Sequence, residues 1–588
     1  MKSVLRLYRF LKPYLGLVIL NLVLMIGLVA ADLSIPRLIQ TLVDTGIRQH
    51  DMAAIVNISL AITGVTVFSA VCTVSSILLV VRISQKTASD IRRKLFVKIQ
   101  SFSFGNFDHL QTGQLLTRLT SDVSQVGQLI LQTLRMFIRA PLMILGSVIM
   151  LMMTNWQIAL IILALMTLAI IVFMLYANKA QPLFMQVQRK LDRLNTIFQE
   201  NLSGVRIVKS FVRADHENER FNGANVDLTD RTIKVERMLA FVLPILRLLA
   251  NLGFVVVVWF GGIKVINGDI TIGQIIAMNN YTLWAMFALV NVGMMVSFIS
   301  SADASAWRIF EVLDSHSEVC DKDHAITLSN VKGRVTFEDV SFAYNGQGQE
   351  PVLNHINLVA EPGETVAIVG STGAGKSTLI NLIPRFYDAT AGKVMIDGID
   401  VRDITINSLR AHVGVALQDT VLFTGTIRDN IRYGRPDAKD EDIFEAAKSA
   451  QAHDFITSFP SGYDTIIGQR GVNLSGGQKQ RLAIARALLL KPSILVLDDA
   501  TSSVDVETEV KIQAALDRFM ADRTSFIVAQ RISTVMRADK IVVLDRGKIE
   551  AVGTHQSLME TSPIYQEIYH SQLGDGKEGE SREQSIIQ

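Results

Sequence analysis

The chain has 588 residues, 49% of them hydrophobic, and its 57 basic and 55 acidic side chains leave a formal net charge of +2. A chain of this length exceeds one compact domain, and its balanced charge gives no electrostatic reason to bind nucleic acid. The two cysteines, Cys72 and Cys320, are too few for a disulfide framework or a cysteine-rich metal site, so both are expected to be unpaired thiols.

Apolar residues concentrate in the first half of the chain, in blocks long enough to cross a bilayer. A helix needs about 20 residues to span a hydrocarbon core of roughly 30 Å. The first block lacks a small-residue cleavage pattern and others follow it, so we interpret it as a retained span and not as a signal peptide. Six transmembrane spans are predicted, at about 14–35, 56–82, 134–154, 157–177, 239–266 and 274–300.

Basic residues predict the orientation of these spans. Lys and Arg gather before the first span and in the two long connections, between spans two and three and between spans four and five. Two of the other connections are very short and carry little charge. Because cytoplasmic connections are enriched in Lys and Arg, the N-terminus, both long connections and everything after span six are predicted to lie in the cytosol.

The two long connections are predicted to be helical hairpins. Each has about 50–60 residues, which is improbable for a structureless loop. Their apolar residues recur every three or four positions, so the spans should continue into the cytosol, where about 25 helical residues project roughly 35 Å. The tips are expected near residues 103–113 and 213–222, and each tip should contact the P-loop domain.

Charged and polar residues also fall inside or near the apolar blocks. Arg139 and Arg247 are either cavity-lining charges or side chains that extend to the membrane surface. The sixth block carries a polar and aromatic stripe, which either lines a substrate path or packs against other helices. Its members are Asn279, Asn280, Tyr281, Trp284 and Phe287.

Composition divides the chain into four parts. Residues 1–310 form the predicted membrane domain, and 311–333 form a polar linker. From Val335 onward short alternating strands replace the apolar blocks, so a second domain is predicted over 334–573. The last segment, 574–588, is rich in Gly, Glu, Ser and Lys and is predicted to be disordered.

The segment 370–377 has the pattern Gly-x4-Gly-Lys-Ser of a P-loop, after the apolar strand 365–369 and before a predicted helix. Its glycines let backbone N–H groups turn toward phosphate oxygens, and the helix N-terminus adds partial positive charge. Lys376 should reach the outer phosphates, and Ser377 should hold Mg²⁺. The phosphate-binding residues predicted here are Gly370, Ser371, Thr372, Gly373, Ala374, Gly375, Lys376, Ser377 and Thr378.

Further polar residues are predicted to complete the site. The buried strand 494–498 ends in Asp498, a carboxylate suited to Mg²⁺ beside a P-loop, and Gln418 follows another apolar run with an amide that could also bind Mg²⁺ or water. A second phosphate cradle is predicted where Ser475, Gly476, Gly477 and Gln478 precede a helix, because Ser475 caps it and the glycines expose N–H groups. Two chains placed head-to-tail would close this cradle on the partner's nucleotide.

These motifs resemble the nucleotide-binding domain of ATP-binding-cassette (ABC) transporters. With six spans ahead of it, the chain to about residue 573 is similar to a half-transporter of the type IV ABC exporters, and more narrowly to the degenerate-site subunit of bacterial heterodimeric multidrug exporters. The resemblance implies an all-α transmembrane domain followed by an α/β P-loop domain, with ATP and Mg²⁺ as cofactors. It also implies that Tyr344 stacks on adenine, that Gln418 senses the nucleotide, that Asp505 lies in the D-loop, and that the hairpin tips hold coupling helices.

Two positions depart from the family pattern. Asp499 stands where the family usually has a glutamate that orients the attacking water, and Gln530 stands where it has a histidine near the γ-phosphate. A shift of about 1 Å in a general base can cost on the order of 10²-fold in rate, and an amide cannot become cationic at neutral pH. We therefore predict weak hydrolysis at this chain's own site and an obligate heterodimer whose partner supplies the competent site. A homodimer that tolerates both residues is the alternative.

The predicted function is ATP-driven export of amphipathic compounds, drug-like or lipid, from the cytosol or inner leaflet by alternating access. A lipid flippase of the same fold remains an alternative, and a regulatory subunit without transport activity is also conceivable. An importer is disfavoured because its membrane and nucleotide parts usually lie on separate chains. The resemblance implies a multi-pass protein of the bacterial inner membrane, with the nucleotide-binding domain in the cytoplasm.

Overall fold

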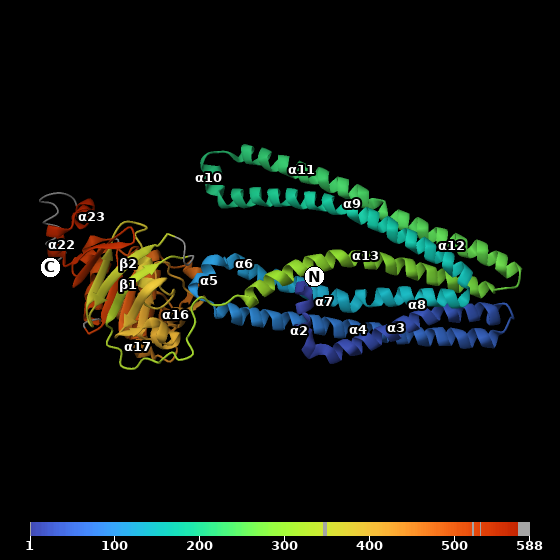
Figure 1. The fold of residues 1–588 in the computed structure, drawn as a ribbon, viewed down its shortest axis with the longest axis horizontal. Helices are drawn as coiled ribbons and strands as arrows, with labels where there is room; N and C mark the ends of the chain where they lie inside the picture. Colours follow the sequence, from blue (N-terminus) through green and yellow to red (C-terminus); the bar gives the residue numbers. More distant parts are fainter. Residues whose placement is uncertain (1, 345–349, 520–521, 530, 574–588) are drawn as a thin grey trace. The chain divides into compact units, whose positions relative to one another are not determined.

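The computed structural model describes residues 2–344, 350–519, 522–529 and 531–573. The chain forms two compact units (Figure 1). Residues 1–100 and 113–315 make the first unit, and the second consists of residues 101–112 and the chain from His316 onward. The interpretations of Gln530 and of the segment 574–588 lie outside the described residues.

The first unit is entirely helical in its described part. Five of its helical segments are long and apolar enough to cross a membrane. The first four contain the first four predicted spans, and the fifth, Arg247–Ile266, covers the later part of the predicted span 239–266. The sixth predicted span, 274–300, falls within α13, a continuous helix of 43 residues. The main helices are α3 (Leu15–Thr41), α4 (Met52–Gln100), α7 (Val123–Gln132), α8 (Arg139–Thr154), α9 (Trp156–Ser203), α10 (Val205–Ser210), α11 (Ala214–Ala240), α12 (Val242–Ile266) and α13 (Ile272–Asp314).

The predicted extension of the spans beyond the bilayer is confirmed. Helix α4 has 49 residues and α9 has 48, so each is about 70 Å long, roughly twice the thickness of a hydrocarbon core. Helix α9 begins at Asn155, whose side chain accepts a hydrogen bond from the Ile158 N–H at 3.1 Å and so caps the helix after the short turn from α8.

The tip of the second hairpin lies earlier in the chain than predicted. Helix α9 ends at Ser203, with Gly204 as its C-cap, α10 forms the tip, and the chain turns again at Val212, which adopts a left-handed φ of +53°. The expected tip at 213–222 is instead the first turns of α11. Helices α9 and α11 run side by side (Figure 1), joined by ion pairs such as Lys190–Asp227 at 2.5 Å.

The second unit contains a six-stranded sheet in the order β12-β11-β3-β10-β9-β6. All neighbouring pairs are parallel except β11 with β12. The inner strands are nearly continuous apolar runs because helices cover both faces of such a sheet. The strands are β3 (Thr365–Val369), β6 (Val413–Ala416), β9 (Ile494–Asp498), β10 (Thr524–Val528), β11 (Lys540–Asp545) and β12 (Lys548–Gly553).

Smaller sheets and the helices complete this unit. A four-stranded antiparallel sheet has the order β2-β1-β4-β5, and β7 pairs with β8. These strands are β1 (Val335–Phe342), β2 (Leu353–Ala360), β4 (Ala391–Ile396), β5 (Ile399–Asp400), β7 (Gly425–Thr426) and β8 (Ile466–Ile467). The helices are α14 (Lys376–Asn381), α15 (Ile406–His412), α16 (Ile427–Arg432), α17 (Asp440–Ser449), α18 (His453–Ser458), α19 (Gly476–Leu489), α20 (Val506–Phe519), α21 (Ile532–Val535), α22 (His555–Thr561) and α23 (Pro563–Leu573).

The tip of the first hairpin, α5 (Phe104–His109), belongs to the second unit. The Phe104 ring stacks on Phe386 with a centroid distance of 4.2 Å, and the Tyr387 hydroxyl donates a hydrogen bond to Asp108 at 2.9 Å. The predicted contact between this tip and the P-loop domain is therefore confirmed.

Candidate functional site

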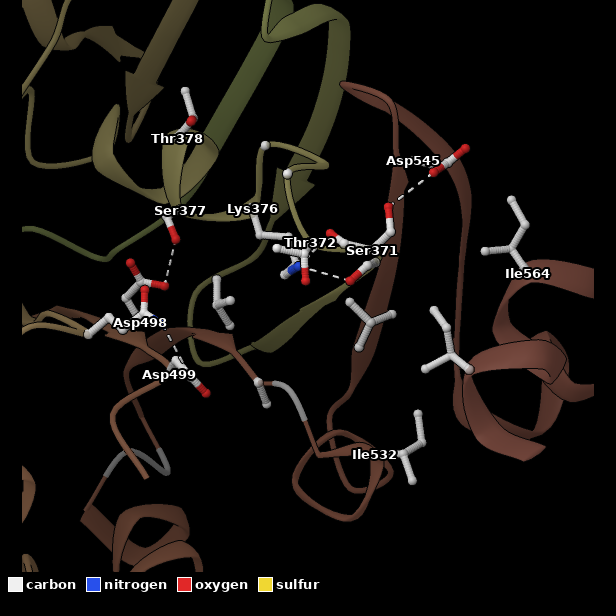
Figure 2. A pocket seen from close by; sticks show the side chains of 18 of the residues that line it. Ser371, Thr372, Lys376, Ser377, Thr378, Asp498, Asp499, Ile532, Asp545 and Ile564 are labelled. Atoms are coloured by element: carbon white, nitrogen blue, oxygen red, sulfur yellow. Dashed lines mark hydrogen bonds between the residues drawn. The ribbon is translucent and has the colours of Figure 1, made fainter. Parts of the chain in front are cut away.

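The carboxyl ends of three adjacent parallel strands define the site. Strand β10 lies between β3 and β9, and Val528 pairs in register with Ile368 on one side and Asp498 on the other. The P-loop therefore begins beside the acidic end of β9, at the edge of the sheet where open α/β folds bind their ligands. A cavity of about 890 Å³ opens there, lined by the P-loop, Gln418, Asp498 and Asp499 (Figure 2).

The P-loop conformation requires glycine at two positions. Gly370 has a φ of +153°, and a Cβ atom there would lie 2.0 Å from the backbone carbonyl oxygen of Leu544. Gly375 has a φ of +101°, and a Cβ atom would lie 2.9 Å from the Leu353 side chain. Residues that carry a Cβ atom rarely adopt such φ values. Glycine is therefore required at both positions for the loop to take this conformation.

Lys376 lies inside the loop that it follows. Its Nζ donates hydrogen bonds to the carbonyl oxygens of Gly370 and Ser371, both at 2.8 Å. Burial lowers the pKa of the Lys376 ammonium, against the opposing effect of the nearby carboxylates of Asp498 and Asp499. The cation is thus held at the centre of the loop, as the sequence pattern predicts for a group that neutralises phosphate charge.

Ser377 and Asp498 form the polar pair expected of a magnesium site. The Ser377 hydroxyl donates to Asp498 Oδ1 at 2.9 Å (Figure 2). Asp498 is only 5% exposed, and burial raises the pKa of its carboxyl group. A hydroxyl and a carboxylate at the wall of a polar cavity are hard oxygen ligands of the kind that Mg²⁺ prefers, so these two residues fit the ion.

Asp499 adopts a left-handed backbone conformation with a φ of +49°. Its N–H donates to the Val528 carbonyl at 2.9 Å, and its side-chain Oδ2 accepts a hydrogen bond from the Gln418 amide at 3.3 Å. The structure therefore brings Gln418 and Asp499 together at the cavity, from the ends of two neighbouring parallel strands, β6 and β9. Gln530, the other unusual residue, lies outside the described part of the chain.

Tyr344 also lines the cavity. Its hydroxyl forms a 2.9 Å hydrogen bond with Thr378 Oγ1, and its ring packs edge-on against Phe342 and Tyr387. The side chain remains 38% exposed, which leaves aromatic surface available for stacking.

Helix α23 forms part of the cavity wall, which the sequence did not predict. Ile564 and Ile568 line the cavity, and Gln572 accepts a 2.8 Å hydrogen bond from the Ile532 N–H. Figure 2 shows Ile564 on the side of the cavity near Ser371 and Asp545, with Ile532 at the bottom of the view. A short helix near the C-terminus with one apolar stripe carries no sequence signal that would have assigned it to this site.

The second predicted phosphate cradle does not line this cavity within the described residues. Ser475 and Gln478 form the expected capping box, in which Gln478 N–H donates to Ser475 Oγ at 3.3 Å and Ser475 N–H donates to Gln478 Oε1 at 2.9 Å. Gly477 packs closely on the segment after β9, because a Cβ atom there would lie 2.8 Å from the Ser503 carbonyl oxygen. The segment predicted to form the second cradle therefore lies away from this chain's own P-loop cavity.

A buried carboxylate, Glu509, connects the segment after β9 with the segment after β10. It is 6% exposed and accepts hydrogen bonds from Thr501 Oγ1 at 3.0 Å and Thr534 Oγ1 at 2.6 Å. Arg531 donates to it at 2.5 Å. Sequence reasoning missed this cluster because Glu509 lies in an ordinary-looking charged helix and gains its partners only when β9 and β10 pair.

Comparison with known proteins gives a consistent result. The family description "ABC transporter transmembrane region" matches residues 18–290, and "ABC transporter" matches residues 353–502. The chain is 39% identical, over 96% of its length and 98% of the relative, to the uncharacterized ABC transporter ATP-binding protein YfiB of Bacillus subtilis. It is 35% identical, over 98% of its length and 95% of the relative, to the ATP-dependent lipid A-core flippase of Syntrophus aciditrophicus.

A solved structure agrees with these matches. The structure of a bacterial Atm1-family ABC exporter with ATP bound superposes with a TM-score of 0.80 at 28% identity, covering 96% of this chain and 99% of the other.

Proposed function

Because this chain belongs to the ABC transporter family, as an exporter with fused transmembrane and ATP-binding domains, we propose that it is the degenerate-site half of a heterodimeric exporter. ATP drives its transport cycle, which follows from the family. The observation that carries the further proposal is Asp499, which stands at the edge of the nucleotide cavity where a glutamate is expected. Its shorter side chain is engaged by Gln418 at 3.3 Å.

The residues of the cavity have separate roles in this proposal. The P-loop N–H groups and Lys376 bind the ATP phosphates, Tyr344 stacks on the adenine, and Gln418 responds to the nucleotide. Ser377 and Asp498, with Gln418, would hold Mg²⁺, which when bound neutralises phosphate charge. Asp499 holds the attacking water poorly because a general base must be within hydrogen-bond reach of it.

The second chain completes both sites. The capping box of Ser475 and Gln478 is intact and lies away from this chain's own cavity. In the proposed dimer it closes on the partner's nucleotide, while the partner's equivalent segment closes on this one. ATP that bridges two chains binds more tightly to the closed dimer than to the open one, and only such unequal affinity can shift the membrane helices between two states.

The substrate is proposed to be amphipathic, and the chain is proposed to lie in a bacterial inner membrane with its nucleotide-binding unit in the cytoplasm. A lipid flippase is the second candidate, favoured by relatives that are named lipid A-core flippases. Stimulation of ATP turnover by amphipathic drugs but not by lipids would favour a drug exporter, and the reverse pattern would favour a flippase.

The test measures ATP turnover and oligomer mass of the purified chain in nanodiscs. The native chain alone should turn over slowly, and Asp499→Glu combined with Gln530→His should raise turnover by about tenfold or more, since misplacing a catalytic group by about 1 Å can cost 10²-fold. Asp437→Glu, at an exposed position, is the matched control and should change nothing. Fast turnover by the native chain as a homodimer, unchanged by an added partner, would contradict the proposal.

A further inference from the structure

The helical unit contains a second cavity, of about 650 Å³, between segments that are far apart in the sequence. Asp32 of α3, Arg135 of the segment Thr133–Phe137, Arg139 of α8, and Trp284 and Phe287 of α13 all line it. We call it the basic aromatic cavity. It brings together two features that the sequence left open: the charge at Arg139 and the aromatic stripe of the sixth predicted span.

The cavity lies away from the connections that follow α3 and α8. Arg139 and Asp32 each precede the end of their helical segment, at Asn155 and Arg48, by about 16 residues, or roughly 24 Å of helix. Arg139 donates a 2.8 Å hydrogen bond to Asp32, so its guanidinium is engaged with another helix of the same unit. An ionisable cluster at this depth is costly and is usually functional.

The charges of the cavity do not cancel. Asp32 is its only acidic lining residue among the described ones, and both of its oxygens are occupied, by Arg139 and by the Ser69 hydroxyl at 2.9 Å. Arg135 is exposed and forms no ion pair or hydrogen bond with another described residue. The cavity therefore contains one guanidinium more than its carboxylate neutralises. Among the described residues, Arg135 has no hydrogen-bond partner, so water would have to accept its hydrogen bonds.

The remaining lining residues supply apolar surface. Phe287 is 68% exposed and Trp284 is half-buried, and they lie three residues apart on α13. Met136 and Met143 add flexible apolar side chains to the same cavity. The lining thus combines a pair of guanidinium groups, four residues apart, with an accessible aromatic pair.

We propose that the basic aromatic cavity binds an amphipathic anion, whose acidic group contacts Arg135 and Arg139 and whose apolar part lies against Trp284 and Phe287. This rests on the proposed exporter function and specifies the charge of its substrate. Guanidinium groups bind carboxylate and phosphate through paired, charge-assisted hydrogen bonds. An amphipathic cation would find only Asp32, and it would have to displace both Arg139 and Ser69 to reach that carboxylate.

Direct binding in nanodiscs of neutral lipid, without nucleotide, tests this. The probes are a dansyl-labelled undecanoic acid and the matching dansyl undecylamine, which differ in the charge of the terminal group. Energy transfer from Trp284 reports binding in a chain whose Trp156, Trp259 and Trp307 are replaced by Phe. The carboxylate probe should bind saturably and at least tenfold more tightly than the ammonium probe.

Variants of the cavity sharpen the test. Arg135→Gln should lower the affinity for the carboxylate probe at least tenfold. Arg247→Gln is the control and should leave this affinity unchanged, because it removes an arginine from an apolar block but not from the cavity. Asp32→Asn should strengthen carboxylate binding several-fold because it releases Arg139 from competition. A gain of affinity cannot come from misfolding, and thermal unfolding of each variant is measured alongside.

Two results would overturn the proposal: equal binding of both probes, or carboxylate binding that Arg135→Gln and Asp32→Asn leave unchanged. Adding phosphatidic acid to the nanodiscs distinguishes the source of the anion, since a lipid ligand would compete with the probe and a soluble one would not. The assay needs no ATP turnover. A failure here therefore leaves the degenerate-site proposal intact, and a failure of that proposal leaves this one intact.

Discussion

The two cavities of this chain are built in opposite ways. The nucleotide cavity is built around the P-loop backbone, which the parallel strands β3, β9 and β10 place beside the acidic end of β9. The basic aromatic cavity is made of single side chains from α3, α8, α13 and the segment Thr133–Phe137. Backbone geometry tolerates almost no change, whereas a side-chain lining can vary while the helices stay in place. The first site should therefore be fixed within a family and the second adaptable to different substrates.

The largest contrast should come from one glycine in each region. In Gly370→Ala the new Cβ would lie 2.0 Å from a backbone carbonyl, at a φ of +153°, and neither can move cheaply. In Gly146→Ala it would lie 2.3 Å from Leu33 Cδ1, the end of a flexible side chain. We expect a loss of about 3 kcal/mol or more for the first and about 1 kcal/mol or less for the second.

Thermal unfolding of both variants, compared with Gly64→Ala as a control with open space around its Cβ, measures this difference. Equal destabilisation at Gly370 and Gly146 would mean that the two regions are equally rigid and would break the comparison.

The next effect concerns the one side chain that the P-loop surrounds. Lys376→Ala removes the cation that is held by two backbone carbonyls, so ATP affinity should fall about 100-fold, which corresponds to about 2.7 kcal/mol. Fluorescent ATP analogues measure the affinity. Lys393→Ala, at an exposed ion pair with Glu338, is the control and should have no effect. In the absence of nucleotide, both variants should bind the carboxylate probe in the basic aromatic cavity as tightly as the native chain does.

The same contrast explains what the sequence could predict. The strand before the P-loop was predicted at 365–369 and the strand before Asp498 at 494–498, and both match β3 and β9. A P-loop requires glycine and lysine at fixed spacing, so a single short segment of the sequence is enough to predict it. The meeting of Asp32 with Arg139 and Trp284 depends on how three helices, α3, α8 and α13, pack together, and no local sequence pattern predicts it. The predicted position of the second hairpin tip was wrong for a related reason. Helix α9 stops at Gly204, but no sequence signal distinguishes this glycine from glycines inside other helices as a helix end.

Glu509 combines features of both cavities. It is a single side chain, but it joins the segments that follow β9 and β10, which the sequence motifs predict. Glu509→Gln keeps the shape but removes the charge that faces Arg531 at 2.5 Å, so we expect a loss of about 2 kcal/mol of stability. ATP turnover of the assembled exporter should also change, because Arg531 directly follows position 530. Glu507→Gln is the matched control, since Glu507 is exposed and, within the part of the chain that the structure describes, forms an ion pair only with Lys511 of the same helix. An unchanged melting temperature for Glu509→Gln would show that the contacts of Glu509 do not contribute to the stability of the fold.

The smallest expected effect lies at α5, the hairpin tip that belongs to the second unit. Tyr387 donates a 2.9 Å hydrogen bond to Asp108 on α5, the tip between the two long helices, and the Phe104 ring stacks on the adjacent Phe386. Tyr387→Phe removes the hydrogen bond and keeps the ring, at a cost of about 1 kcal/mol to this contact. ATP affinity should stay constant while stimulation of ATP turnover by a cavity ligand falls several-fold.

Tyr433→Phe, which removes an exposed hydroxyl from a ring stacked on Phe423, should leave both quantities unchanged. If Tyr387→Phe lowered ATP affinity as well, the tip would help to shape the nucleotide cavity. The nucleotide cavity would then depend on a side-chain contact with α5, and the difference between the two kinds of cavity would not hold at this point. If it altered neither quantity, the stacked pair of Phe104 and Phe386 would be sufficient to transmit the motion, since aromatic pairs contribute about 1 kcal/mol by themselves.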